Sequence, residues 1–541
     1  MTINILIGIG GTGAKIVESA LYLLSTGVGP QDGVTIGIVD QDNANGNVVR
    51  TENLLTLLQA VRSDFSAPRK NVIDWKGSAQ QGGTGLFSIN VKPLFAHGAH
   101  WRPAPDNKPN LRHILQHQDM PEAEKILFDM MFRGEAAGDA DEEQTMDLAE
   151  GYRGRAHVGA AALVSAINHD QPEFMAALLE LLQMSSTGQD VRIFMAGSLF
   201  GGTGAAGFPT IARMLHKLRT PEPGTVATDA KVKADKIKIG GALMLPYFSF
   251  APPPDARANV IAASQLLPQA RVAVEFYQNL QQQEKVFDRL YVSGWDKMFD
   301  MGYHEPGRAE QRNPALIPEL VAALAAMDFF TLDSDKVKTD KPMVAARRDE
   351  RTFGWDDLPA HDALKKPLYE KLGGALRFAL WWRYRVEPAV DERGKVGSFW
   401  DSGGWLKKLV GKDIDWQNET PGARENLKNY CEFILTWASS ARLFSDDVIH
   451  DFALWNGDRL LGKSDLKNPT DPVALHVQRS EDESEADLDA LLHRRDPTEP
   501  LIDARTVFGD LHEPIATGKS AALGRLVAAI HHATRPLREK V

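Results

Sequence analysis

Short apolar runs recur along residues 1–335, and each is bounded by polar or glycine-containing segments. Runs of this kind are typical of strands buried on both faces of a parallel sheet. The predicted strands are Ile3–Ile9, Val34–Val39, Val191–Ala196, Ile237–Leu245 and Phe287–Ser293.

Segments with a helical spacing of apolar residues lie between or after these runs. The predicted helices are Ala14–Leu24, Met120–Phe132, Thr210–Leu218, Arg257–Gln283 and Ala315–Phe330. Residues Ala315–Phe330 are apolar nearly all round, which predicts a helix in the middle of the molecule. Because strands alternate with helices, we predict an α/β fold with a Rossmann-like, mostly parallel sheet.

The pattern changes beyond residue 335. A charged stretch is followed by helical patterns at residues 363–382 and 424–443, and residues 464–500 are acidic with little apolar content. Such a composition favours a mobile linker. The predicted units are an α/β domain (1–312), a central helix (313–331), a second, mainly helical domain (332–463), the acidic linker (464–500) and a C-terminal helical segment (501–541).

Composition narrows the class of protein. The 541 residues carry a net charge of −11, which argues against a nucleic-acid partner. Cys431 is the only cysteine, so neither an intrachain disulfide nor a multi-cysteine zinc site can form. No apolar run is long enough to span a membrane, and the N-terminus begins directly with a strand. We therefore expect a cytoplasmic protein without a membrane span.

Two predicted strands end in glycine-rich turns that open a helix, and both turns read GGTG. Backbone N–H groups at a helix N-terminus attract anions, and glycine lets the backbone approach a phosphate closely. One such turn also fits a connection that merely packs a helix on a sheet, but a matched pair favours a ligand whose phosphates are held from two sides. The predicted phosphate-binding residues are Gly10, Gly11, Thr12, Gly13, Gly201, Gly202, Thr203 and Gly204, with both threonines as hydroxyl donors.

The first turn also fits a dinucleotide-binding fingerprint, Gly8-x-Gly10-x-x-Gly13. Asp40 ends the second predicted strand, where such folds place an acidic residue on a ribose. Asp40 also lies in the polar sequence VDQDNANGN, whose residues are common turn formers. A nicotinamide-dependent oxidoreductase therefore stays an alternative, although it leaves the second turn without a role.

Two further motifs lack the strand that a phosphate loop needs. A third GGTG at residues 82–85 follows no strand and is predicted to be a surface loop, and Gly518-Lys519-Ser520 is interpreted as a helix start. The segment GYRGRAHVG leads into an alanine-rich helix. Its Arg153, Gly154 and Arg155 are candidates for phosphate contact, although exposed arginines usually have no such role.

The order of these motifs resembles the tubulin/FtsZ superfamily, in particular its divergent prokaryotic tubulin-like members. The segment SLFGGTG at residues 198–204 is similar to the glycine-rich signature of that family, and Gly10–Gly13 stands where the family has its first phosphate loop. Residues Gly154–Gly159 are similar to the loop that touches the γ-phosphate. Ala315–Phe330 is similar to the central helix, and the resemblance covers residues 1–335.

The resemblance implies that the chain binds GTP or GDP with Mg²⁺ and assembles head to tail with copies of itself. Asp40 would then face the ribose, and Asn313 or Glu319 would read the base edge. A carboxylate suits guanine, but Glu319 also fits a simple partner of the helix dipole.

The chain departs from the family pattern where the family has its catalytic acid. In the family an acidic loop after the central helix activates water at the next subunit's nucleotide. The best substitutes here are Asp356 and Asp357, which also fit a helix cap. The sequence thus predicts slow GTP hydrolysis, or else a non-hydrolysing scaffold whose C-terminal region binds a protein partner.

Overall fold

The computed structural model describes residues 1–65, 85–104, 107–132, 142–167, 172–220, 232–251, 263–301, 311–339, 341–347, 352–387, 421–443, 445, 448–449, 451–456, 491–493 and 522–534. Most of the third GGTG motif and all of residues 257–259 and 518–520 lie outside these ranges.

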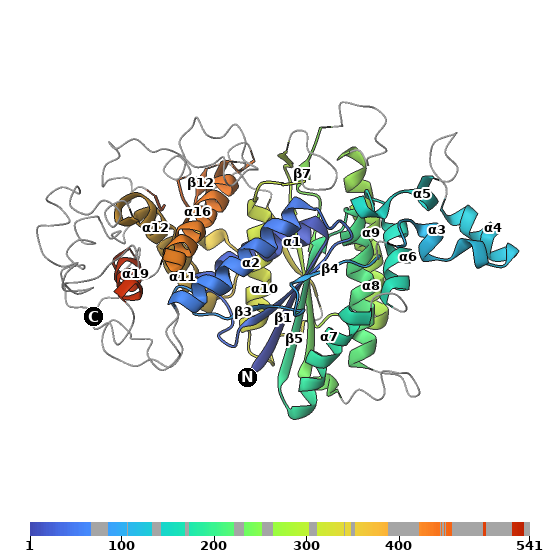
Figure 1. Ribbon diagram of the computed structural model, residues 1–541, viewed down its shortest axis with the longest axis horizontal. Coiled ribbons are helices and arrows are strands. Elements are labelled where there is room, and N and C mark those ends of the chain that lie inside the picture. The colour runs from blue at the N-terminus through green and yellow to red at the C-terminus, as the bar shows by residue number, and fades with distance from the viewer. Residues whose placement is uncertain are drawn as a thin grey trace, which may run out of the picture.

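A parallel sheet of eight strands forms the centre of the molecule, which confirms the predicted α/β fold with a Rossmann-like sheet (Figure 1). The strand order is β10-β8-β6-β5-β1-β2-β3, and β4 also pairs with β2. The strands are β1 (Thr2–Ile9), β2 (Val34–Val39), β3 (Val91–Pro93), β4 (His100–Trp101), β5 (Asp190–Ser198), β6 (Ile237–Met244), β8 (Arg289–Trp295) and β10 (Met343–Arg347). Two short pairs, β7 (Phe248–Ser249) with β9 (Phe299–Asp300) and β11 (Phe353–Gly354) with β12 (Phe452–Ala453), lie outside the sheet.

Helices cover both faces of the sheet because successive strand residues point to opposite sides. In β1, Leu6 belongs to one hydrophobic core, whereas Ile5 and Ile7 belong to the other. The Leu6 face packs against α1 (Gly10–Ser25), α2 (Gly46–Phe65) and α10 (Ile317–Thr331). The other face packs against α6 (Ala156–Ser165), α7 (Pro172–Gln183), α8 (Gly202–Arg219) and α9 (Ala263–Glu284).

Helix α10 is buried all round from Ile317 to Phe330, as its apolar sequence predicted. A Cβ on Gly240 of β6 would lie 2.7 Å from ring atoms of Phe329 in α10, so only glycine allows this close packing. At its C-terminal end, Arg192 Nη1 of β5 donates to the carbonyls of Phe329 and Phe330 at 2.8 and 3.0 Å. An arginine at a helix C-terminus satisfies carbonyls that have no partner within the helix.

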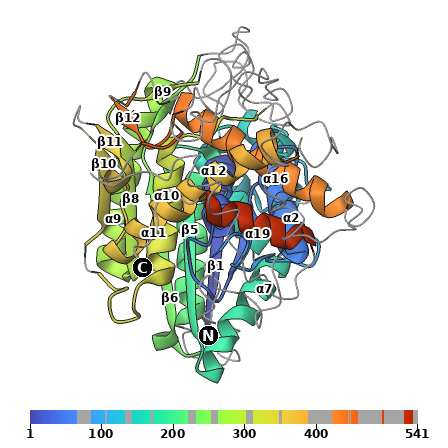
Figure 2. The same cartoon turned by 90° about the vertical axis from the view of Figure 1, so that its left-hand side faces the viewer.

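The C-terminal helices form a further layer over α1 and α2 (Figure 2). They are α11 (Asp362–Leu368), α12 (Gly374–Trp381), α16 (Pro421–Leu443) and α19 (Ala522–Ala533). A π-helical segment follows α11 at Tyr369–Gly373, and another follows α12 at Trp382–Val386. Tyr430 of α16 hydrogen-bonds Ser25 of α1 at 2.9 Å, and Trp437 donates to Ser19 at 3.3 Å. One continuous core joins this layer to the sheet.

A small arm projects beyond α6, at the right of Figure 1. It contains α3 (Leu111–Ile114), α4 (Glu122–Met131) and α5 (Glu142–Thr145), and it has a core of its own that includes Phe128 and Tyr152.

Several elements differ from the sequence prediction, and three of them are long or join the central sheet. Helices α2 and α7 were not predicted, and β10 lies within the range of the second domain but pairs with β8 of the central sheet. Of the range predicted as an acidic linker, the structure describes residues 491–493. These pair with residues 454–456 through backbone hydrogen bonds from Asn456 N to Leu491 O and from His493 N to Leu454 O.

Candidate functional site

A cavity of about 170 Å³ lies at the carboxyl ends of β1, β2 and β5. The strand order reverses here, since the chain runs from β1 to β2 on one side and to β5 and β6 on the other. Ligands of open parallel sheets bind at such switch points. Of the predicted site residues, the cavity is lined by Gly10, Gly11, Thr12, Asp40, Gly154, Gly201, Gly202, Thr203, Gly204 and Asn313.

The first glycine turn continues directly into α1. Gly10 has φ +75°, and a Cβ there would lie 3.1 Å from the backbone nitrogen of Gly204, so the two glycine turns abut. Gly13 does not line the cavity. A Cβ at Gly13 would lie 2.6 Å from the carbonyl carbon of Gly8 and 2.7 Å from the oxygen of Ala196. Gly13 therefore lets α1 pack closely on the strands.

The second glycine turn opens α8, with Gly201 as the N-cap residue. A Cβ on Gly204 would lie 2.7 Å from the carbonyl oxygen of Ser198. One on Gly202 would lie 2.9 Å from the backbone nitrogen of Gly154. The turn thus needs glycine both to fold back on β5 and to accept the neighbouring loop.

That neighbouring loop, residues 151–154, has three left-handed positions, with φ +78° at Gly151, +44° at Arg153 and +81° at Gly154. Gly154 reaches the cavity. Arg155 does not line it, and its Nε lies 3.4 Å from a Glu143 carboxylate oxygen instead. The structure therefore brings Arg153 and Gly154, but not Arg155, to the predicted phosphate site.

Helices α1 and α8 both point their N-termini at the cavity, and neither has an acidic residue in its first turn. The free N–H groups and the dipoles of both helices favour an anion at this place. This arrangement fits a phosphate group.

Asp40 lies opposite these N-termini and is 3% exposed. Its carboxylate accepts from Asp42 N at 3.2 Å, from Asn45 Nδ2 at 3.2 Å and from the Thr203 hydroxyl at 3.4 Å. Burial raises the pKa of Asp40 to about 7, against the opposing effect of the hydrogen bonds from Asp42 N and Thr203. The contact with Thr203 places Asp40 beside the second glycine turn.

A carboxylate beside a phosphate site repels the ligand unless a cation or a proton neutralises it. Asp40 and Asp42 both line the cavity and supply oxygen atoms, which Mg²⁺ prefers. Because Mg²⁺ is usually held by one or two carboxylates together with phosphates, this donor set fits a magnesium–nucleotide complex. Within the described residues no group of three or more His, Cys, Asp or Glu side chains forms a metal site by itself.

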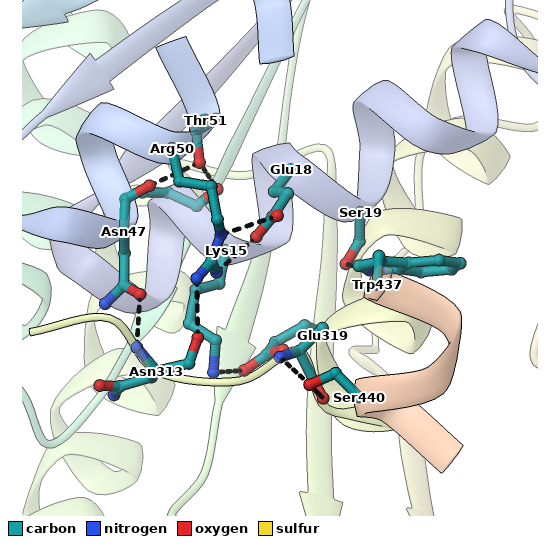
Figure 3. Close-up of polar contacts among 12 residues, drawn as sticks. Lys15, Glu18, Ser19, Asn47, Arg50, Thr51, Asn313, Glu319, Trp437 and Ser440 are labelled. Carbon is teal, nitrogen blue, oxygen red and sulfur yellow. Dashed lines mark hydrogen bonds and ion pairs between the residues drawn. The ribbon is translucent and has the colours of Figure 1, made fainter. Parts of the chain in front are cut away.

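Asn313 reaches the cavity from the segment before α10. Its backbone N–H donates to Asn47 Oδ1 at 2.8 Å, and its carbonyl accepts from Arg50 Nη1 at 3.1 Å (Figure 3). Its side-chain Oδ1 is buried and has no hydrogen-bond partner within the described part of the chain. A buried acceptor without a partner is costly, and a ligand donor would satisfy it.

Glu319, the other predicted base-reading residue, does not line the cavity and is fully buried. Its carboxylate forms an ion pair with Lys15 of α1 and accepts from the Tyr247 hydroxyl at 2.6 Å and from Leu316 N at 2.7 Å. The last contact is the capping interaction expected of a glutamate in the first turn. Burial lowers the pKa of Lys15, and Glu319 opposes that effect.

Asp356 and Asp357, the predicted catalytic residues, also lie outside the cavity. They belong to a 3-10 turn at Trp355–Asp357, and Asp357 Oδ2 accepts from Gly354 N at 2.7 Å. Within one subunit the structure does not bring either carboxylate to the glycine turns.

Sequence reasoning missed two parts of the cavity wall. One is a group of amides, in which Asn45 Nδ2 donates to Gln311 Oε1 at 2.9 Å and Asn47 contacts Asn313. The polar sequence after the second strand was the available signal for Asn45 and Asn47. The other part is apolar and consists of Phe200, Phe248, Phe250, Ala251 and Leu266.

No described helix has the length and apolar composition needed to cross a bilayer. Comparison with known proteins adds no relative: no protein-family model matches the chain, and no curated protein matches its sequence.

Proposed function

We propose that the chain is a tubulin-like protein that binds GTP or GDP with Mg²⁺ in the cavity between the two glycine turns. The observation that carries this proposal is the meeting of two glycine-opened helix N-termini, α1 and α8, at one switch point of the sheet. The phosphates would lie against backbone N–H groups of Gly10–Thr12 and Gly201–Gly204. Bound Mg²⁺ supplies the positive charge that offsets Asp40 and the phosphates.

The base would lie toward Asn313, whose buried Oδ1 requires a donor. Guanine offers N1–H and N2–H₂ on one edge, and the phenylalanine wall supplies an apolar surface for a ring. Asn313, and not Glu319, is therefore the proposed base-reading residue.

The alternative is a nicotinamide cofactor on the Gly8–Gly13 fingerprint. It is favoured by the close packing of Gly13 on Gly8 and by the position of Asp40 at the end of β2. It accounts less well for the second glycine turn and for the hydrogen bond from Thr203 to Asp40.

The proposed activity includes nucleotide-dependent assembly in the cytoplasm. Because Asp356 and Asp357 lie outside the cavity of their own subunit, hydrolysis through them would need a neighbouring copy stacked head to tail. The alternative to hydrolysis is a scaffold that binds nucleotide without hydrolysing it and binds a protein partner through the C-terminal helices.

Isothermal titration with Mg-GTP, Mg-ATP and NAD tests the ligand. We expect GTP to bind more tightly than ATP and NAD, and Gly204→Ala to weaken GTP binding at least tenfold, since the new Cβ would collide with Ser198 O. The matched control is Gly85→Ala at the same position of the third GGTG, where a Cβ meets no atom of the described residues within 4 Å. Preference for NAD, or equal binding by the two variants, would contradict the proposal.

A further inference from the structure

Helix α4 lies at the outer end of the arm and turns an apolar face to solvent (Figure 1). Ile126, Leu127, Met130 and Met131 are 54%, 56%, 66% and 59% exposed. Together with the exposed Ala123 they follow the spacing i, i+3, i+4, i+7, i+8, which places all five on one side of a helix. A side with this spacing normally faces a protein core, and large apolar side chains that are exposed next to one another mark an interaction site.

The opposite side of α4 is already packed against the arm. Phe128 and Phe132 are 4% and 5% exposed and belong to the core of the arm. Their ring centroids lie 5.1 Å apart, and the His117 ring lies 4.9 Å from the Phe128 ring. Because the two phenylalanines fix the rotation of the helix, the apolar face is left for a partner.

The surroundings of this face are acidic. Residues 119–143 contain nine acidic and two basic residues. Glu122 and Glu124 of α4 are exposed, and the helical repeat places them on either side of the apolar face. An acidic surface repels nucleic acid and anionic lipid and attracts a basic partner.

A second copy of the chain fits this face less well than a basic partner does. Two such faces would bring Glu122 and Glu124 of both copies together, and like charges across an interface are unfavourable. Helix α4 has 10 residues. Its length of about 15 Å is short for the roughly 800 Å² that each partner buries in a stable complex. A short apolar face with acidic flanks instead suits one amphipathic helix, which docks through apolar residues of the same spacing.

We infer that the exposed face of α4 binds a basic amphipathic helix of another protein. The apolar residues of that helix pack against Leu127 and Met130, and its lysines or arginines contact Glu122 and Glu124. Methionine side chains are flexible and adapt to the shape of a partner. No nucleotide takes part in this contact, so the inference is independent of the function proposed above.

The test measures binding of a labelled peptide to the intact protein by fluorescence anisotropy. The probe consists of leucine and lysine, with leucine at the spacing of the α4 face, and has about 18 residues so that it can form a helix when bound. A second probe has glutamate in place of lysine. We expect the lysine probe to bind, and the glutamate probe to bind at least about tenfold more weakly.

Two double variants separate the apolar and the acidic contributions. Leu127→Gln with Met130→Gln removes two apolar side chains without a change in charge, and it should weaken binding of the lysine probe about tenfold. Glu122→Gln with Glu124→Gln should weaken binding at low salt and reduce its dependence on salt concentration.

The matched control is Val272→Gln with Phe276→Gln on α9. These two side chains are 67% and 45% exposed, and their replacement should leave binding of the lysine probe unchanged. Because every replaced side chain is exposed, all three double variants should melt close to the temperature of the unaltered protein.

Equal binding of the two probes, or equal effects of the apolar variants on α4 and α9, would overturn the inference. Self-association in sedimentation velocity that is lost in the Leu127→Gln, Met130→Gln variant would overturn it as well, and would assign the face to a second copy. Binding to phosphatidylserine vesicles that is lost in the same variant would overturn it in favour of a membrane surface.

Discussion

At the scale of single residues, Asp40 is the group whose charge matters most to the site. It is buried, it lies where two helix N-termini favour anions, and its pKa is raised to about 7 from 3.8. The folded protein therefore holds this proton more tightly than the unfolded chain does. The contribution of Asp40 to stability is fully present below about pH 4 and is lost as the pH rises through 7.

Asp40→Asn should remove this dependence. In urea unfolding of the free protein, we expect the variant to be more stable than the unaltered protein at pH 8 by on the order of 1–3 kcal/mol, because an amide avoids a buried charge. The difference should shrink as the pH is lowered toward 5. A variant that is less stable at pH 8, or a difference that does not change with pH, would show that Asp40 is readily ionised in the folded protein.

At the scale of elements, α1, α2 and the start of α10 are joined by buried charges. Arg50 of α2 makes two hydrogen bonds to the Glu18 carboxylate of α1, at 2.7 and 2.9 Å, and a third to the carbonyl of Asn313 (Figure 3). The side chains of Arg50 and Glu18 are 14% and 5% exposed. Asn313 is thus held in place by an ion pair whose two residues do not line the cavity.

Arg50→Met should destabilise the protein by about 3–5 kcal/mol, because it leaves the Glu18 carboxylate buried without its partner. Replacing Glu18 with Leu in the same chain should restore most of that loss. The control is Arg271→Met, which breaks an exposed pair with Glu275 on α9 and should cost less than about 1 kcal/mol. Chemical denaturation checks all three, and equal losses at Arg50 and Arg271 would contradict the account.

Elements with strong local signals were predictable from the sequence. The strand–glycine–helix units β1–α1 and β5–α8 and the apolar α10 appear where expected. Helix α2 was missed among charged residues, although Leu54, Leu58 and Val61 have helical spacing and are buried. Strand β10 was missed because it is a short edge strand with an exposed Val344, which gives no buried-strand pattern.

The candidate site was predictable only in part, because only some of its residues belong to local sequence motifs. Glycine turns are local, so their residues were found. Which residue at the start of α10 faces the cavity depends on how the helix is rotated against α1. The pairing of Glu319 with Lys15 settles this rotation and could not be read from spacing.

At the scale of the whole molecule, the cavity and the proposed catalytic pair are separate. Asp356 and Asp357 lie in the turn between β11 and α11, and no part of that turn lines the cavity. If the pair acts on nucleotide, it acts from a second copy. Assembly and hydrolysis should therefore appear together.

Phosphate release from GTP should be slow and should rise per subunit with protein concentration, while light scattering rises in parallel. Asp356→Ala or Asp357→Ala should suppress release by at least about tenfold, since each removes a group that orients water. Turnover that is independent of concentration and unchanged in both variants would place the catalytic group within one subunit.

The central claim is that one ligand is held by both glycine turns. Amide hydrogen exchange of the intact protein, with and without saturating Mg-GTP, tests it most directly. The account predicts slower exchange at residues 10–12, 151–154 and 201–204 together, because residues of all three segments line the cavity. Slower exchange confined to residues 10–12 would contradict the account and would favour a dinucleotide held by the first turn alone.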